Sequence, residues 1–236
     1  MLEQLGLAIC GQDLPTGTVV KTEEIENQYQ VSRSVVRETV RVLESMGLVS
    51  SRRRVGVLIL APTFWNLYDP QVIRWRLASS DRITQLRSLT ELRVAIEPEA
   101  ARLAAIRAPL TIATDLLGLS NRMRAAGQIG DQELFLSLDV HFHRLILASS
   151  GNEMFAKLDS LVAEVLTGRT HYGLMPLHPH EEAMQLHSEV ASAIQKGAAD
   201  LAHDAMLAIM ERTMQEMSSL WESPTQNLNK KRRRKT

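Results

Sequence analysis

Three side chains in the second half of the chain could hold a divalent metal. Asp139 and His143 are four residues apart, so on a helix they lie on the same face. A carboxylate oxygen and an imidazole nitrogen placed in this way can bind one ion, and His187 could supply a third ligand from a later segment. The alternative is that these histidines are structural side chains.

Two arginines could bind a small carboxylate. Arg93 and Glu97 are also four residues apart, which fits a buried ion pair that stabilises the fold. It fits equally an arginine that binds an anion through both branches of its planar guanidinium. Arg169 is a second candidate for such an anion clamp.

A basic cluster in the first 60 residues could bind nucleic acid. Residues 31–56 carry six arginines against two acids, a local net charge of +4. Arg33 and Arg37 share one helix face, and Ser32 and Ser34 lie at the helix start, where backbone N–H groups point outward. Arginine can bridge O6 and N7 of guanine or contact a phosphate.

A basic turn follows this helix. The β-rich runs 48–51 and 55–60 flank it and predict a hairpin suited to a minor groove or to flanking phosphates. The candidate contacts of this turn are Arg52, Arg53, Arg54 and Gly56. The alternative for both basic groups is a solvated surface, with Glu38 or Glu44 paired to an arginine of the helix.

The elements that position the basic cluster are predicted in residues 1–60 as helix, helix, helix and hairpin. This is the layout of a winged helix-turn-helix domain. In the third helix Ser32 can serve as the N-cap and Gly47 can end the helix. The expected core face of that helix comprises Val35, Val36, Val40, Val42, Leu43 and Met46.

The metal and anion candidates lie in residues 80–222, which predict an all-α helical bundle. Apolar residues recur there at a 3.6-residue period in six segments separated by Gly and Pro. The segments are 83–106, 110–126, 132–149, 154–172, 180–196 and 198–221. Residues 61–79 are predicted as a linker with a linker helix, and residues 223–236 as a disordered basic tail. The predicted fold class is therefore mainly α.

Composition limits the function classes. The 236 residues are 44% hydrophobic and 23% charged, as in ordinary globular proteins. No apolar run approaches the roughly 18 to 20 residues that span a bilayer, and we expect neither a secretory leader nor a membrane partner. The single cysteine, Cys10, cannot form an internal disulfide, so the cytoplasm is the expected compartment.

The basic helix and turn have a specific likeness. The runs VSRSVVRE at 31–38, RVLESMGLV at 41–49 and RRRVG at 52–56 resemble the winged-helix domain of the GntR family of bacterial transcription regulators. On the preceding helix, where family members often carry a basic residue, this chain has TEE at 22–24, and Lys21 is the nearest basic group. The resemblance implies a DNA-binding regulator and not an enzyme.

The second half resembles the all-helical FCD ligand domain of the FadR-like subgroup of that family. The residues that carry this likeness are ELR at 91–93, Glu97, Asp139, His143, ASSGN at 148–152 and His187. The resemblance implies a divalent ion, zinc, nickel or manganese, held by one Asp and three His, with open positions for a carboxylate effector. The fourth ligand position corresponds to Ile209, which cannot ligate, so the site would complete itself with water or effector, bind metal weakly, or bind none.

These observations predict a ligand-responsive repressor that acts as a homodimer on double-stranded operator DNA, because one recognition helix reads only a few base pairs. The linker run WNLYD at 65–69 is similar to members that sense sugar acids such as galactonate, so the expected effector is a sugar acid. Two alternatives are a metal-dependent enzyme that uses Asp139, His143 and His187, and a constitutive DNA-binding protein whose helical domain only dimerises.

Overall fold

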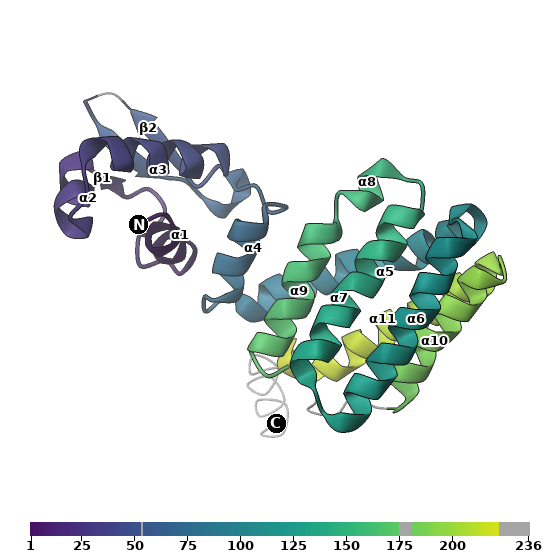
Figure 1. The fold of residues 1–236 in the computed structure, drawn as a ribbon. Helices are drawn as coiled ribbons and strands as arrows, with labels where there is room; N and C mark the ends of the chain where they lie inside the picture. The colour runs from purple at the N-terminus through teal and green to yellow at the C-terminus, as the bar shows by residue number, and fades with distance from the viewer. Residues whose placement is uncertain (53, 175–180, 222–236) are drawn as a thin grey trace, which may run out of the picture. The chain divides into compact units, whose positions relative to one another are not determined.

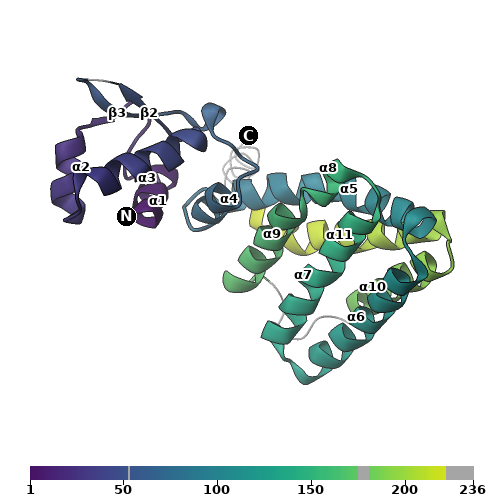
Figure 2. The ribbon, with the colours of Figure 1, turned by 45° about the horizontal axis from the view of Figure 1, so that its top comes forward.

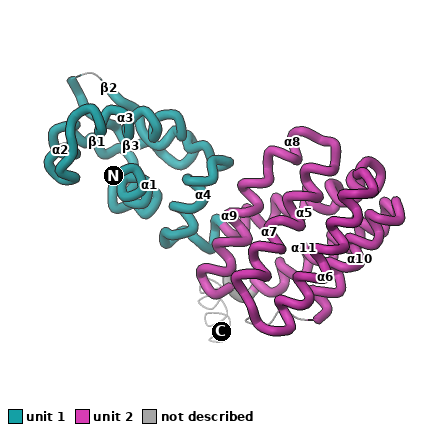
Figure 3. Tube along the Cα trace, in the orientation of Figure 1, with its two compact units in different colours: residues 1–85 teal, residues 86–236 magenta. Residues whose placement is uncertain are grey.

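The chain is described by a computed structural model that covers residues 1–52, 54–174 and 181–221. It divides into two compact units, unit 1 with residues Met1–Gln85 and unit 2 with residues Leu86–Thr236 (Figure 3). The predicted mainly α class, a winged helix-turn-helix followed by a helical bundle, is confirmed. Arg53 and the predicted tail at 223–236 lie outside the described residues.

Unit 1 begins with three helices and a three-stranded sheet (Figure 1). The helices are α1 (Leu2–Cys10), α2 (Thr22–Tyr29) and α3 (Arg33–Ser45), and the strands are β1 (Val19–Val20), β2 (Val49–Arg52) and β3 (Gly56–Ile59). The strands are antiparallel in the order β1-β3-β2. β2 and β3 form the predicted hairpin, whereas β1 was not predicted.

The packing of α3 explains how this helix presents its charged side. Val36, Val40 and Leu43 are buried in the core of unit 1. The prediction that Val35 and Val42 also face the core is wrong, because they are 45% and 38% exposed. Each is the neighbour of a core position, and successive helical residues point about 100° apart. Only one side of α3 is therefore held by the core.

The segment predicted as a linker packs within unit 1. It forms the 3-10 helix η1 (Pro62–Phe64) and the helix α4 (Pro70–Leu77), which contacts α1. The side chain of Asp69 caps α4 by accepting hydrogen bonds from the backbone N–H groups of residues 71 and 72. Trp75 of α4 is fully buried. A Cβ added at Gly6 of α1 would lie 2.5 Å from the Trp75 ring, so only glycine fits there.

We expect Gly6→Ala to destabilise unit 1 by about 1–3 kcal/mol, because the buried Trp75 ring would have to move to admit a methyl group. Thermal unfolding followed by circular dichroism measures this loss. Gly118→Ala is the matched control, since a Cβ at Gly118 meets nothing within 4 Å. It should leave the stability unchanged or raise it by about 0.5–1 kcal/mol. Equal midpoints for Gly6→Ala and the wild type would contradict this packing.

Unit 2 is the predicted helical bundle (Figure 2). Its helices are α5 (Arg82–Arg107, which begins in unit 1), α6 (Leu110–Ile129), α7 (Gln132–Ser149), α8 (Glu153–Ala156), α9 (Asp159–His171), α10 (Glu181–Gln195) and α11 (Ala199–Trp221). α7 packs between α6 and α9, and α10 packs between α6 and α11. The segment predicted as one helix over 154–172 is divided into α8 and α9 by a break at residues 157–158.

The interior of unit 2 contains an unusual set of polar side chains. Those exposed by 5% or less include Arg93, Glu97, Asp139, His143, Arg169 and His187. Buried ionisable groups are rare unless they are paired or bind an ion, so this set is the candidate functional site. Among the described helices, none has the length and apolar character needed to cross a membrane.

Candidate functional site

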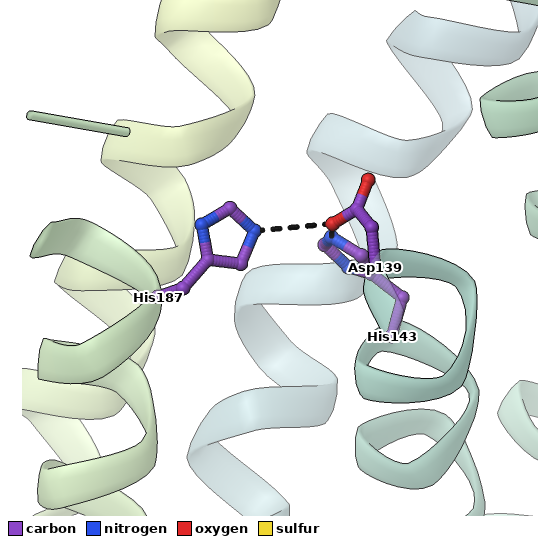
Figure 4. A group of neighbouring side chains, drawn as sticks. All are labelled: Asp139, His143 and His187. Atoms are coloured by element: carbon purple, nitrogen blue, oxygen red, sulfur yellow. Dashed lines mark ion pairs between the residues drawn. The ribbon is translucent and has the colours of Figure 1, made fainter. Parts of the chain in front are cut away.

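α7 and α10 bring the three predicted metal ligands together (Figure 4). Asp139 and His143 project from the same side of α7, and His187 faces them from α10. One ligand atom of each residue lies within 4.8 Å of the other two. Asp139 Oδ1 is 3.3 Å from His143 Nε2 and 3.2 Å from His187 Nε2. One ion could therefore reach all three side chains.

The remaining ring nitrogens lie beside oxygen atoms, which places Nε2 of each ring toward the ion position. His187 Nδ1 lies 2.7 Å from the carbonyl oxygen of Ala183, which can only accept, so Nδ1 carries a proton. His143 Nδ1 forms an ion pair with Glu97 Oε2, without the geometry of a hydrogen bond. In a neutral imidazole protonated at Nδ1, the lone pair is on Nε2. His187 Nε2 and Asp139 Oδ1 are buried without a hydrogen-bond partner among the described atoms, so a divalent cation could satisfy both.

The pKa values follow from this mutual contact. Burial raises the pKa of Asp139, but the adjacent His143 and His187 outweigh burial and leave it well below its usual range. Burial also opposes ionisation of Glu97, yet Arg93 and His143 lower its pKa to about 2. For His143, burial favours the neutral ring, but Glu97 and Asp139 raise its pKa to about 9. At neutral pH the metal-free site therefore holds His143 as an imidazolium.

Metal binding should release a proton and tighten with pH, because the ion needs the lone pair of His143, whose pKa is about 9. Between pH 6 and pH 9 the affinity should rise by up to about tenfold per pH unit. Calorimetry in buffers of different ionisation enthalpy should find close to one proton released per metal at pH 7. A pH-independent affinity over this range would contradict the raised pKa.

The same pKa predicts the pH dependence of stability in the metal-free protein. The pKa of His143 rises from 6.5 in the unfolded reference to about 9 in the fold. Its contribution to stability is therefore complete below about pH 6.5 and is lost as the pH rises through about 9.

Two buried guanidinium groups lie in the same interior. Arg93 donates from Nε to Glu97 Oε1, and its Nη2 is 3.4 Å from Glu97 Oε2, so the predicted ion pair is present. Arg169 contacts Thr213 Oγ1 at 3.4 Å and Glu216 Oε2 at 3.5 Å. Burial and the charge of Arg93 lower the pKa of Arg169 to about 10. Arg93 Nη1 and Arg169 Nε are buried without a partner among the described atoms and could bind an anion.

Among the described residues, the candidate metal ligands are Asp139, His143 and His187, and α11 contributes none of them. Ile209 is 6% exposed and cannot ligate. Thr213, one helical turn later, contacts Arg169, so this face of α11 borders the polar interior. The remaining coordination positions would have to be filled by water or by a bound anion.

Glu97 has a second partner that the spacing along the sequence did not indicate. Its pairing with Arg93 follows from their i, i+4 spacing on α5, but its contact with His143 joins α5 to α7. Such a contact depends on how two helices pack. The signal available in the sequence was a glutamate one helical turn after an arginine, in a helix that lacks metal ligands. Many arrangements other than a contact with His143 are compatible with that pattern.

On unit 1, α3 presents the predicted DNA contacts to solvent. Ser32, Arg33, Ser34 and Arg37 are all exposed at the start of the helix. In the described part of the chain neither Arg33 nor Arg37 has an ion-pair partner. Ser32 occupies the predicted N-cap position, but its Oγ lies 2.9 Å from Ser34 Oγ and makes no cap hydrogen bond.

The two acids of α3 have partners other than Arg33 and Arg37. Glu38 accepts a hydrogen bond from Arg41 at 2.7 Å, and both side chains are more than half exposed, so this pair contributes little stability. Glu44 Oε1 accepts from the backbone N–H of Ser51 in β2 and ties the helix to the hairpin. The arginines at the helix start are therefore not neutralised by either acid.

The β2–β3 turn carries the predicted basic residues of the hairpin. Arg52 and Arg54 are exposed, and Arg54 adopts a φ of +65° in the turn. Gly56 has a φ of +130°, and a Cβ there would lie 2.7 Å from the carbonyl oxygen of Val20. The glycine is thus needed for the close approach of β1 and β3, independently of any contact with DNA.

Both units match known families. Residues 2–59 match the model of bacterial regulatory proteins of the gntR family, and residues 88–212 match the FCD domain. The chain belongs to the GntR family. This GntR protein is accordingly a DNA-binding transcription regulator, and the alternative of a metal-dependent enzyme is excluded.

Relatives of this GntR regulator extend over most of its length. The galactonate operon transcriptional repressor of Escherichia coli is 25% identical over 213 residues, which cover 89% of this chain and 91% of that protein. The solved structure of Streptococcus agalactiae GntR is 25% identical with a TM-score of 0.50 and covers 89% of this chain and 97% of its own. E. coli McbR/YncC, at 16% identity, shares the fold with a TM-score of 0.55 over 93% of this chain and 96% of its own.

Proposed function

We propose that this GntR-family protein is a metal-dependent repressor that responds to a small carboxylate. In this proposal Asp139, His143 and His187 bind a divalent metal, and Arg93 and Arg169 bind the carboxylate. The observation that carries the proposal is the buried group of ligand atoms and arginine donors that lack partners among the described atoms. Such atoms are costly to bury unless a ligand satisfies them.

The charges of the interior favour an anionic effector. Two guanidinium groups and two carboxylates are buried there, so a divalent metal would leave a net positive charge. Three protein ligands leave one open position on tetrahedral zinc and three on an octahedral ion such as nickel or manganese. Carboxylate and hydroxyl oxygens of a sugar acid suit these positions. The name of the E. coli galactonate operon repressor and the linker run at 65–69 support that class.

On the DNA side, we propose that the start of α3 enters the major groove of operator DNA. Ser32, Arg33, Ser34 and Arg37 would contact bases and phosphates there, while the β2–β3 turn contacts the adjacent backbone or minor groove. A homodimer on a pseudo-palindromic site would double this small contact surface.

Regulation requires that the effector favours one arrangement of the domains over another, since equal affinity for both would change nothing. We propose that effector binding reorients the wings and releases the operator.

A gel-shift titration tests this function. Operator duplexes are first selected from random DNA with the purified protein, and the metal-loaded protein is then titrated with D-galactonate and D-gluconate. A repressor of this kind should lose operator affinity by about 5- to 150-fold at saturating effector. An acid that binds without changing operator affinity would refute the sensor mechanism. Absence of both metal and acid binding would favour a constitutive DNA-binding protein with a helical dimerisation domain.

A further inference from the structure

We infer that Glu97 is a positioning residue of the metal centre. Glu97 holds His143 in the orientation that directs Nε2 toward the ion, and Arg93 holds Glu97 itself in place. The inference rests on the proposed metal site, and it assigns a role to a helix, α5, that supplies no ligand in the described group.

The contacts of Glu97 divide between its two oxygens. Oε2 forms the ion pair with His143 Nδ1. Oε1 accepts from Arg93 Nε, the closer of the two Arg93 contacts. Both contacts of Glu97 are closed to solvent, because Arg93, Glu97 and His143 are 1%, 1% and 2% exposed. Water therefore has little access to either contact.

The arrangement determines which nitrogen of His143 can ligate. A carboxylate ion-paired with Nδ1 favours the proton there, leaves the lone pair on Nε2 and makes the ring a stronger ligand. His143 Nε2 is the atom that lies 3.3 Å from Asp139 Oδ1. His187 obtains the same orientation from a backbone carbonyl, so His143 is the ligand whose orientation depends on a replaceable side chain.

Glutamine at position 97 is the informative substitution, because it keeps the volume but offers one carbonyl oxygen to two donors. One of Arg93 and His143 must then face the amide N–H₂ group instead of an acceptor. Glu99→Gln is the matched control, since Glu99 lies two residues further along α5 in a half-exposed pair with Arg102.

Competition with a chromophoric chelator measures the zinc affinity of the wild type and both variants. Glu97→Gln should weaken zinc binding by about 10- to 100-fold, the usual effect of removing the partner of a ligating histidine. Glu99→Gln should leave it unchanged. Equal zinc affinity in the wild type and Glu97→Gln would overturn the inference while preserving the metal site. A wild type that binds no zinc would overturn the proposed metal site as well.

A measurement on the wild type avoids dependence on the folding of the variant. In ¹⁵N-histidine protein loaded with ¹¹³Cd, the spectrum should show metal coupling at Nε2 of His143 and a proton at its Nδ1. The signal is assigned by its loss in His143→Ala. Cadmium coupling at Nδ1 would overturn the inference.

Discussion

Replacing His143 with alanine is expected to weaken binding of divalent metal by more than about 100-fold. Loss of the hydrogen-bond partner of a ligating histidine typically costs 10- to 100-fold, and loss of the ligand itself should cost more. The substitution leaves two ligands, Asp139 and His187, and removes the ring that approaches Asp139 within 3.3 Å. Calorimetric titration of metal-stripped protein with zinc, nickel and manganese measures the effect.

The control for this prediction lies on the same helix. His141 is exposed on another face of α7, so His141→Ala should bind metal as the wild type does. Operator binding of the metal-free protein should be unaffected by either substitution, since unit 1 is left intact. Circular dichroism establishes that both variants are folded. Undiminished metal affinity in a folded His143→Ala protein would remove His143 from the ligand set.

Replacing Arg37 with alanine is expected to weaken operator binding by about 1–3 kcal/mol, which is about 5- to 150-fold. Arg37 is exposed near the start of α3 and has no ion-pair partner among the described residues, so its guanidinium is available to guanine or phosphate. Fluorescence anisotropy with the selected operator duplex measures the loss. Because the substitution is in unit 1, affinity for metal and sugar acid should not change.

Two comparisons sharpen the test of Arg37. Arg41→Ala removes an arginine on the same helix that is already paired with Glu38, and it should have the smaller effect on DNA binding. If Arg37 reads a guanine, its substitution should also reduce discrimination against a changed base pair, whereas loss of a phosphate contact would weaken binding to all duplexes equally. Unchanged operator affinity in Arg37→Ala would contradict the assignment of α3 as the recognition helix.

Much of the fold could be predicted because it depends on local patterns. The periodicity of apolar residues located the helices of the bundle, and the i, i+4 spacing of Asp139 and His143 placed both on one face of α7. His187 was included in the ligand set because of the resemblance to the FCD domain. It lies 44 residues beyond His143, and such a separation carries no local signal that the two side chains are close.

The features that the sequence did not reveal depend on tertiary packing. The contact between Glu97 and His143 requires α5 and α7 to be adjacent. β1 is only two residues long and has no period to detect. The predicted core face of α3 was too wide, because the sequence does not show which of its apolar valines face the core. Only the packed helix distinguishes Val36, which is fully buried, from Val35, which is 45% exposed.

The most direct test of the central proposal is thermal unfolding of metal-stripped protein with divalent ions and then with sugar acids. A ligand that binds only the folded state at 100 times its Kd stabilises it by about 2.7 kcal/mol. For a domain of this size, each kcal/mol raises the midpoint by about 2–4 °C. We predict a rise with one or more divalent ions and a further rise with a sugar acid only when metal is present. No shift with any ion or acid would contradict the metal-dependent sensor.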